Sequence, residues 1–413
     1  MSSAAQLKGS TAAETNLAIL DLIRSSGVVS RTELVDRSGL TGASITRIIR
    51  QLLDDGLIAE TGLGESTGGK RRTLIQLNAS ARPAVGISLD FDQITYAVIN
   101  LGGQVIAQRS TKGTGSRSPY QVTQRIAEEV DSLLKASDID SELVVGIGVA
   151  IAGRRGSRDQ GHPSNAKATD WEHFALEETL GAASGKSVLV ENDSTCAAIG
   201  EYWVGRLPST QNFATVYMTD GFGLGLVIRG GIYRGASGNA GEIGHMTVDP
   251  KGPKCACGRR GCLHVMGGVE SLVATARRDP TLVKEVGLRA TPRSVRADYI
   301  KIARAAVSGN ERASRLIDQS AEYLASTLVS ITNLLDLDQI ILAGPGFSVA
   351  GSRYADVAAD RLRQFSWARS IHEIRVGLSR MGSDDAALGA ASLVLHSQLT
   401  PRQTSGRAVA SAR

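Results

Sequence analysis

The stretch AVGISLDF, residues 84–91, decides the fold class, because its pattern occurs twice along the chain. It is followed by YAVINLGGQVIA, residues 96–107, and the second occurrence is NFATVYMTDG, residues 212–221, followed by GLVIRGGIYRG, residues 225–235. Each occurrence reads as a strand, a turn, a second strand and a hairpin that contains glycine. Short apolar strands alternate with helices throughout residues 84–398, and the strand–turn–strand pattern occurs twice there. The sequence therefore predicts two α/β lobes, each starting with this pattern, with a cleft between them.

Composition and charge are those of a globular protein with two or three domains. The chain has 413 residues, of which 42% are hydrophobic and 21% charged, and its net charge is +5. We find no apolar run of about 18 residues and no apolar core of a secretory signal, so we expect no membrane contact and a cytoplasmic location. Residues 399–413 are small and polar, and we expect them to be disordered.

Residues 14–78 predict a separate winged helix-turn-helix domain. An apolar-periodic helix ends at Gly27, a second helix is capped by Ser30 with Glu33 completing a capping box, and Thr41 caps a third. LIAET and RTLIQLN, separated by a glycine-rich tip, then read as a two-stranded hairpin, the wing.

The third helix and the wing tip carry the residue types that contact phosphates and base edges. Residues 1–80 hold nine Lys/Arg and eight Asp/Glu, so the prediction rests on where the charges lie and not on bulk charge. The alternative is a helical dimerisation module with a solvated basic loop. The candidate DNA-binding residues are Ser44, Thr46, Arg47, Arg50, Lys70, Arg71 and Arg72.

Three of the four cysteines lie in KCACGRRGCLHV, residues 254–265. The spacing C-x-C-x4-C, with glycines at 258 and 261, lets the backbone fold around one ion, and three thiolates with one imidazole suit tetrahedral Zn²⁺. Spacing alone leaves the fourth ligand open between His264 and His245. The alternative is a redox cluster or a group of buried free thiols.

These motifs together resemble the ROK family (repressor, open reading frame, kinase). The most specific are NAGEIGHMTVDP at 239–250 and CACGRRGC at 255–262, and ENDSTCAAIGE at 191–201 resembles the active-site segment of the family. The resemblance extends from residue 14 to residue 395. It implies an α/β fold of two actin-like, ribonuclease-H-like lobes behind the winged helix.

The resemblance also implies the site residues. The structural zinc ligands would be His245, Cys255, Cys257 and Cys262. His264 stands where the family usually has a sugar-contacting glutamate, which puts the identity of the sugar in doubt. Asp193 matches the general base of the family kinases, although a helix cap is the plain alternative for it. The implied sugar-binding residues are Asn165, Asn192, Asp193, Glu242, His245 and His264.

The phosphate loops depart from the kinase pattern. Where the family has Asp-x-Gly-Gly-Thr, this chain has Asp90-Phe91-Asp92-Gln93-Ile94, and where it has Gly-Thr-Gly-x-Gly, this chain has Thr219-Asp220-Gly221-Phe222-Gly223. Glycines that admit phosphates are missing, and carboxylates at Asp92 and Asp220 repel them. We therefore expect a chain that is not an enzyme, with Asp193 as a vestigial base.

The predicted function is a sugar-responsive DNA-binding regulator, most simply a repressor of carbohydrate uptake and catabolism genes. Its expected partners are operator DNA, a small carbohydrate or sugar phosphate, and further copies of itself in a homodimer or homotetramer. Two alternatives stay open: a ROK kinase that phosphorylates hexoses with ATP, and a constitutive repressor whose sugar cleft is vestigial.

Overall fold

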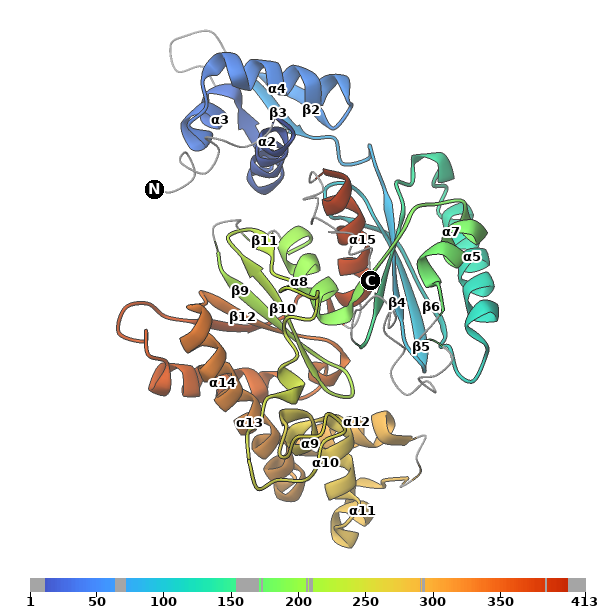
Figure 1. Ribbon diagram of the computed structural model, residues 1–413, viewed down its shortest axis with the longest axis vertical. Helices are drawn as coiled ribbons and strands as arrows, with labels where there is room; N and C mark the ends of the chain where they lie inside the picture. Colours follow the sequence, from blue (N-terminus) through green and yellow to red (C-terminus); the bar gives the residue numbers. More distant parts are fainter. Residues whose placement is uncertain are drawn as a thin grey trace, which may run out of the picture.

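A computed structural model describes residues 12–63, 72–153, 171, 174–205, 207, 211–289, 291, 294–382 and 385–399. It shows a small N-terminal domain above two larger lobes, each built on its own sheet (Figure 1). No helix in these ranges is long and apolar enough to cross a membrane.

The N-terminal domain has three helices and a three-stranded sheet in the order β1-β3-β2. Its elements are α2 (Ala12–Ser26), β1 (Val28–Ser30), α3 (Arg31–Ser38), α4 (Gly42–Asp54), β2 (Ile58–Leu63) and β3 (Thr73–Leu77). The predicted capping box is confirmed: Ser30 and Glu33 each accept a backbone N–H from the other. The predicted hairpin is present as the antiparallel pair β2 and β3. The prediction did not include β1, which pairs antiparallel with β3 and makes the sheet three-stranded.

The first lobe is a five-stranded sheet in the order β6-β5-β4-β7-β8, with helices on its outer face (Figure 1). Its strands are β4 (Ala84–Leu89), β5 (Gln93–Ile99), β6 (Val105–Lys112), β7 (Ile147–Ile151) and β8 (Val188–Asn192). Its helices are α5 (Pro119–Ala136), the 3-10 turn η1 (Ser141–Leu143) and α7 (Leu176–Ser184).

The second lobe repeats this topology in the order β11-β10-β9-β12-β13. Its strands are β9 (Phe213–Met218), β10 (Phe222–Ile228), β11 (Gly231–Ile232), β12 (Gln339–Ala343) and β13 (Arg375–Leu378). In both sheets three strands run antiparallel and two more continue parallel to the first. The doubled sequence pattern therefore predicted the two lobes correctly.

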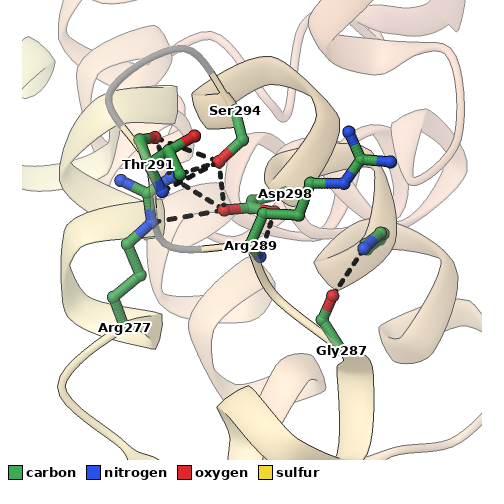
Figure 2. Close-up of polar contacts among 7 residues, drawn as sticks. Arg277, Gly287, Arg289, Thr291, Ser294 and Asp298 are labelled. Carbon is green, nitrogen blue, oxygen red and sulfur yellow. Dashed lines mark hydrogen bonds and ion pairs between the residues drawn. The ribbon is translucent and has the colours of Figure 1, made fainter.

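Helices of the second lobe lie beneath and beside its sheet. They are η2 (Ile243–His245), α9 (Leu263–Gly267), α10 (Val269–Ala276), α11 (Pro280–Val286), α12 (Val295–Val307), α13 (Glu311–Leu335), η4 (Pro345–Phe347) and α14 (Gly351–Phe365). The first turn of α12 is anchored by buried Asp298, which accepts hydrogen bonds from Arg277 at 2.7 Å and Ser294 at 3.0 Å (Figure 2). The backbone N–H of Arg289 donates to the same carboxylate, so Asp298 ties α10, α12 and the loop between α11 and α12 together.

Two helices, α8 (Asp193–Trp203) and α15 (Asp385–Leu399), lie between the two sheets (Figure 1). Small residues let them approach closely. A Cβ placed on Gly389 of α15 would lie 1.8 Å from the carbonyl oxygen of Cys196 in α8. Helix α15 packs equally tightly on the first sheet, where a Cβ on Gly148 would lie 1.9 Å from the carbonyl oxygen of Ala390.

Candidate functional site

Four side chains at the base of the second lobe form a group that could hold one metal ion. The ligand atoms of His245, Cys255, Cys257 and Cys262 all lie within 4.8 Å of one another. His245 Nδ1 is 3.5 Å from Cys255 Sγ, and Cys257 Sγ is 3.6 Å from Cys262 Sγ. These separations fit a tetrahedron with bonds of ~2.1 Å to nitrogen and ~2.3 Å to sulfur.

The backbone around this group depends on glycine. Gly258 and Gly261 have φ values of +90° and +58°, a region that other residues rarely adopt. A Cβ on Gly261 would lie 1.6 Å from the carbonyl oxygen of Asp249. Only glycine at position 261 allows this loop conformation, in which Cys262 lies near His245.

His264 is outside the group of four and faces a different site. It lines a cleft of about 780 Å³ between the lobes, together with Asn192, Asp193, Glu242 and His245. Its ring lies against the backbone at residue 221, where a Cβ would be 2.4 Å from His264 Nδ1. Burial lowers the pKa of His264, so a neutral imidazole faces the cleft at neutral pH.

Asn192 and Asp193 enter the cleft at the first turn of α8. Asn192 is the helix cap, and its side-chain oxygen accepts from the N–H groups of Ser194 at 3.0 Å and Thr195 at 3.4 Å. Asn192 is therefore the N-cap of α8, and the Asp193 carboxylate also accepts the N–H of Ser194, at 2.7 Å. Burial, together with the negative charges of Asp90 and Glu242, raises the pKa of Asp193 to about 7.

An ion pair crosses from one lobe to the other at the predicted phosphate loops. Arg296, on the first turn of α12, donates to Asp90 at the end of β4 at 2.9 Å. The second nitrogen of its guanidinium lies 3.9 Å from Asp92. A positively charged side chain of the protein itself therefore pairs with Asp90 directly and lies near the second carboxylate of the first loop.

The candidate DNA-binding side chains of the third helix lie on one exposed face of α4. Thr46, Arg47 and Arg50 are exposed, whereas Ile45, Ile48 and Ile49 are fully buried on the opposite face. Ser44 is half-buried beside the cap residue Thr41. Arg72 is exposed at the base of the wing, and Lys70, Arg71 and the sugar-site candidate Asn165 lie outside the described residues.

The structure adds residues that the sequence pattern did not indicate. Glu270 of α10 and Tyr217 of β9 line the cleft, and Arg296 reaches the first phosphate loop. None of them belongs to a motif with fixed spacing. The pairing of Arg296 with Asp90 spans 206 residues, so no local pattern could have found it.

Comparisons with known proteins agree with this architecture. A model of the ROK family matches residues 84–397, and a model of the MarR family matches residues 13–61. The chain is 26% identical over 381 residues to the xylose repressor of Bacillus subtilis, covering 91% of this chain and 94% of the relative. It is 29% identical over 330 residues to the DNA-binding transcriptional dual regulator NagC of Escherichia coli, covering 79% of each.

A solved structure shares the fold over nearly the whole length. The crystal structure of a ROK family transcriptional regulator, a homologue of the Escherichia coli MLC protein, superposes with a TM-score of 0.73 at 24% identity. The match covers 94% of this chain and 96% of that one, and thus includes both the winged helix and the two lobes. Since the family model spans most of the chain and agrees with the two repeated sheets, the chain belongs to the ROK family and carries a MarR-type helix-turn-helix domain at its N-terminus.

Proposed function

We propose that this chain is a cytoplasmic, sugar-responsive repressor of carbohydrate uptake and catabolism genes. The observation that carries the proposal is a winged helix with an exposed cationic recognition face joined to a polar interlobe cleft in one chain. Relatives whose alignments cover 91% and 79% of this chain are named as a xylose repressor and as a DNA-binding transcriptional dual regulator. In the proposal, the exposed face of α4 reads operator DNA and the wing contacts its backbone.

The cleft suits a small carbohydrate. The amide of Asn192, the carboxyl groups of Asp193 and Glu242, and the imidazoles of His245 and His264 offer donors and acceptors to adjacent hydroxyls. A metal bound at His245 Nδ1 would leave the other ring nitrogen to the cleft. The relatives make D-xylose and N-acetyl-D-glucosamine the first sugars to test.

We propose Zn²⁺ as the ion held by the group of four, in a structural role. Three thiolates and one imidazole are the donor set that Zn²⁺ prefers, and all four positions come from the protein, which is typical of structural sites. The zinc would fix the loop that carries His245, and thereby one wall of the cleft.

The alternative function is phosphorylation of a hexose by ATP. One observation favours it: a pKa of about 7 would suit Asp193 as a general base. Against it stand the loss of the phosphate-loop glycines and the Arg296–Asp90 ion pair, which occupies the carboxylate of the first loop. ATP consumption coupled to a hexose panel distinguishes the two, and sugar-dependent turnover would contradict the repressor proposal.

The direct test is selection of DNA from the native genome by the purified full-length protein, followed by gel-shift titrations with and without each sugar. We expect a specific palindromic site bound by a dimer or tetramer, and at least one sugar that changes its affinity. A specific site with no sugar response would favour a constitutive repressor with a vestigial cleft. No specific site at all would overturn the proposal.

A further inference from the structure

Helix α8 has one end in the cleft and the other against the N-terminal domain. Its cap Asn192 and first residue Asp193 line the cleft. Its last two residues, Tyr202 and Trp203, lie about 15 Å further along, because an α-helix rises ~1.5 Å per residue. Figure 1 shows this end of α8 below α2 of the winged helix.

Arg24 of α2 holds the C-terminal end of α8. Its guanidinium donates to the carbonyl oxygen of Trp203 at 3.0 Å and to that of Tyr202 at 3.4 Å. The last carbonyl groups of a helix have no partner within the helix, and the negative end of the helix dipole attracts a cation. Arg24 therefore caps α8, although 178 residues separate it from Tyr202.

The same guanidinium is enclosed on its other sides. It lies 5.0 Å from the ring centroid of Tyr202 and 4.7 Å from that of Trp203, within the range of cation–π attraction. Asp21, one turn earlier on α2, pairs with it at 2.7 Å and accepts from the Tyr202 hydroxyl at 2.9 Å. The imidazole of His396 on α15 packs edge-on against both aromatic rings.

These contacts form a buried cluster and not an exposed ion pair. We call the cluster the Arg24 joint; its members are Arg24, Asp21, Tyr202, Trp203 and His396. Arg24 is only 4% exposed, and a cation removed from water in this way is stabilised only while its partners stay in place. A rotation or shift of α8 would separate the guanidinium from both carbonyls and both rings. The joint therefore has one well-satisfied arrangement, and displaced arrangements are costly.

We propose that Arg24 is the positioning residue through which the cleft controls the winged helix. A sugar that binds at Asn192 and Asp193 acts on the first turn of α8, and α8 transmits the displacement to Arg24 and hence to α2. The inference rests on the proposed function, since it assigns the regulation of the same cleft. It requires that the sugar bind the two arrangements of the joint with different affinities.

The test compares the wild type with Arg24→Met and Tyr202→Phe in the full-length protein. Methionine keeps an apolar stem but removes every hydrogen bond and the charge, and phenylalanine removes only the hydroxyl that contacts Asp21. Arg109→Met is the matched control, because Arg109 pairs with Glu129 in the first lobe at 3.2 Å, away from the joint. The probes are D-xylose, N-acetyl-D-glucosamine and the genome-selected DNA.

Two quantities are measured for each protein: the dissociation constant of the sugar, and the ratio of DNA affinities with and without the sugar. For Arg24→Met we expect a sugar affinity within about twofold of the wild type and a ratio that falls to near one from the ~5–150-fold typical of allosteric coupling. Tyr202→Phe should reduce the ratio partially, and Arg109→Met should leave it unchanged. Amide hydrogen exchange in α2 should be faster in Arg24→Met even without sugar.

The outcomes separate the two proposals. If the wild type responds to sugar and Arg24→Met responds equally, the inference about Arg24 is overturned while the repressor function stands. Unchanged exchange in α2 would also overturn it, because Arg24 would then not hold the domain. If the wild type binds DNA but no sugar alters its affinity, the sugar-responsive function and the inference fail together.

Discussion

The carboxyl group of Asp193 is costly to ionise because it lies at the floor of the cleft beside other negative charges. Burial, Asp90 and Glu242 raise its pKa from 3.8 to about 7. The folded chain therefore binds this proton more tightly than the unfolded chain does. Between pH 3.8 and about 7 this group lowers the stability of the fold as pH rises.

Asp193→Asn removes this dependence while keeping the shape of the side chain. We expect the variant to have a higher free energy of unfolding than the wild type at pH 8, and the difference to shrink at pH 5, where the wild-type carboxyl is protonated. Denaturant unfolding of the sugar-free protein at pH 8 and at pH 5 measures this difference in the free energy of unfolding. Asp131→Asn, at an exposed surface pair with Lys135, is the control. If the variant and the wild type differ in free energy of unfolding by the same amount at pH 8 and at pH 5, Asp193 is ionised at both and its pKa is not raised.

At the recognition face, Arg47 and Arg72 should have different effects on DNA. If Arg47 contacts a base edge, Arg47→Ala should weaken binding to the selected site by about 1–3 kcal/mol and relax its specificity. Arg72→Ala should weaken binding to all sequences and reduce the salt slope by about 0.9 if it contacts a phosphate. Gel shifts over a salt series test both, and equal effects of the two variants on specific and random DNA would contradict the assignment.

Among the elements, the loop from His245 to Cys262 brings its four candidate ligands together through turns at Gly258 and Gly261. We expect about one zinc per purified chain, and Cys257→Ser should lose it and lower the thermal midpoint of the lobes. Cys196→Ser, which changes a buried thiol of α8 outside the group, controls for loss of a thiol. Full zinc content in Cys257→Ser, or zinc lost in His264→Ala but kept in His245→Ala, would contradict the ligand set.

The crossing of α8 and α15 is a second element with a narrow tolerance. Gly389→Ala places a methyl group 1.8 Å from the carbonyl oxygen of Cys196, so the two helices must move apart. Overpacking of this kind costs typically about 1–3 kcal/mol, which a denaturant midpoint would show. Gly377→Ala is the control, since a Cβ there meets nothing within 4 Å. An unchanged midpoint in Gly389→Ala would show that the crossing adapts without cost.

Features that depend on residues close together in the sequence could be predicted from it, and features that depend on distant residues could not. The cap at Ser30, the apolar face of α4 and the doubled strand pattern were predictable, because each depends on neighbours within a few residues or on a repeated period. Strand β1 was missed because three residues carry too little pattern and their partner strand lies more than 40 residues later. Arg24 and Arg296 were missed because they contact residues 178 and 206 positions away.

Across the whole molecule, the cleft and the recognition helix are joined through the two lobes and the joint at Arg24. Linkage makes the effect reciprocal: a sugar that weakens DNA binding must bind free protein more tightly than DNA-bound protein by the same factor. Typical couplings are about 1–3 kcal/mol. The close packing of the first sheet on α15 and of the second sheet on α8 gives the lobes a tight mechanical contact with both helices.

The corresponding prediction uses Asp193→Asn again, now for regulation. The variant should keep its DNA affinity, because residue 193 lines the cleft and is not part of α4. It should lose the response to sugar, because one of the two acceptor oxygens of the carboxylate becomes an NH₂ group, which can only donate. DNA affinity with and without D-xylose or N-acetyl-D-glucosamine measures it, with Asp131→Asn as the control. His245→Ala should lose more, since that residue would serve both the metal and the sugar. A normal sugar response in Asp193→Asn would remove the first turn of α8 from the binding site, and the coupling would then have to begin elsewhere in the cleft, at Glu242 or Glu270.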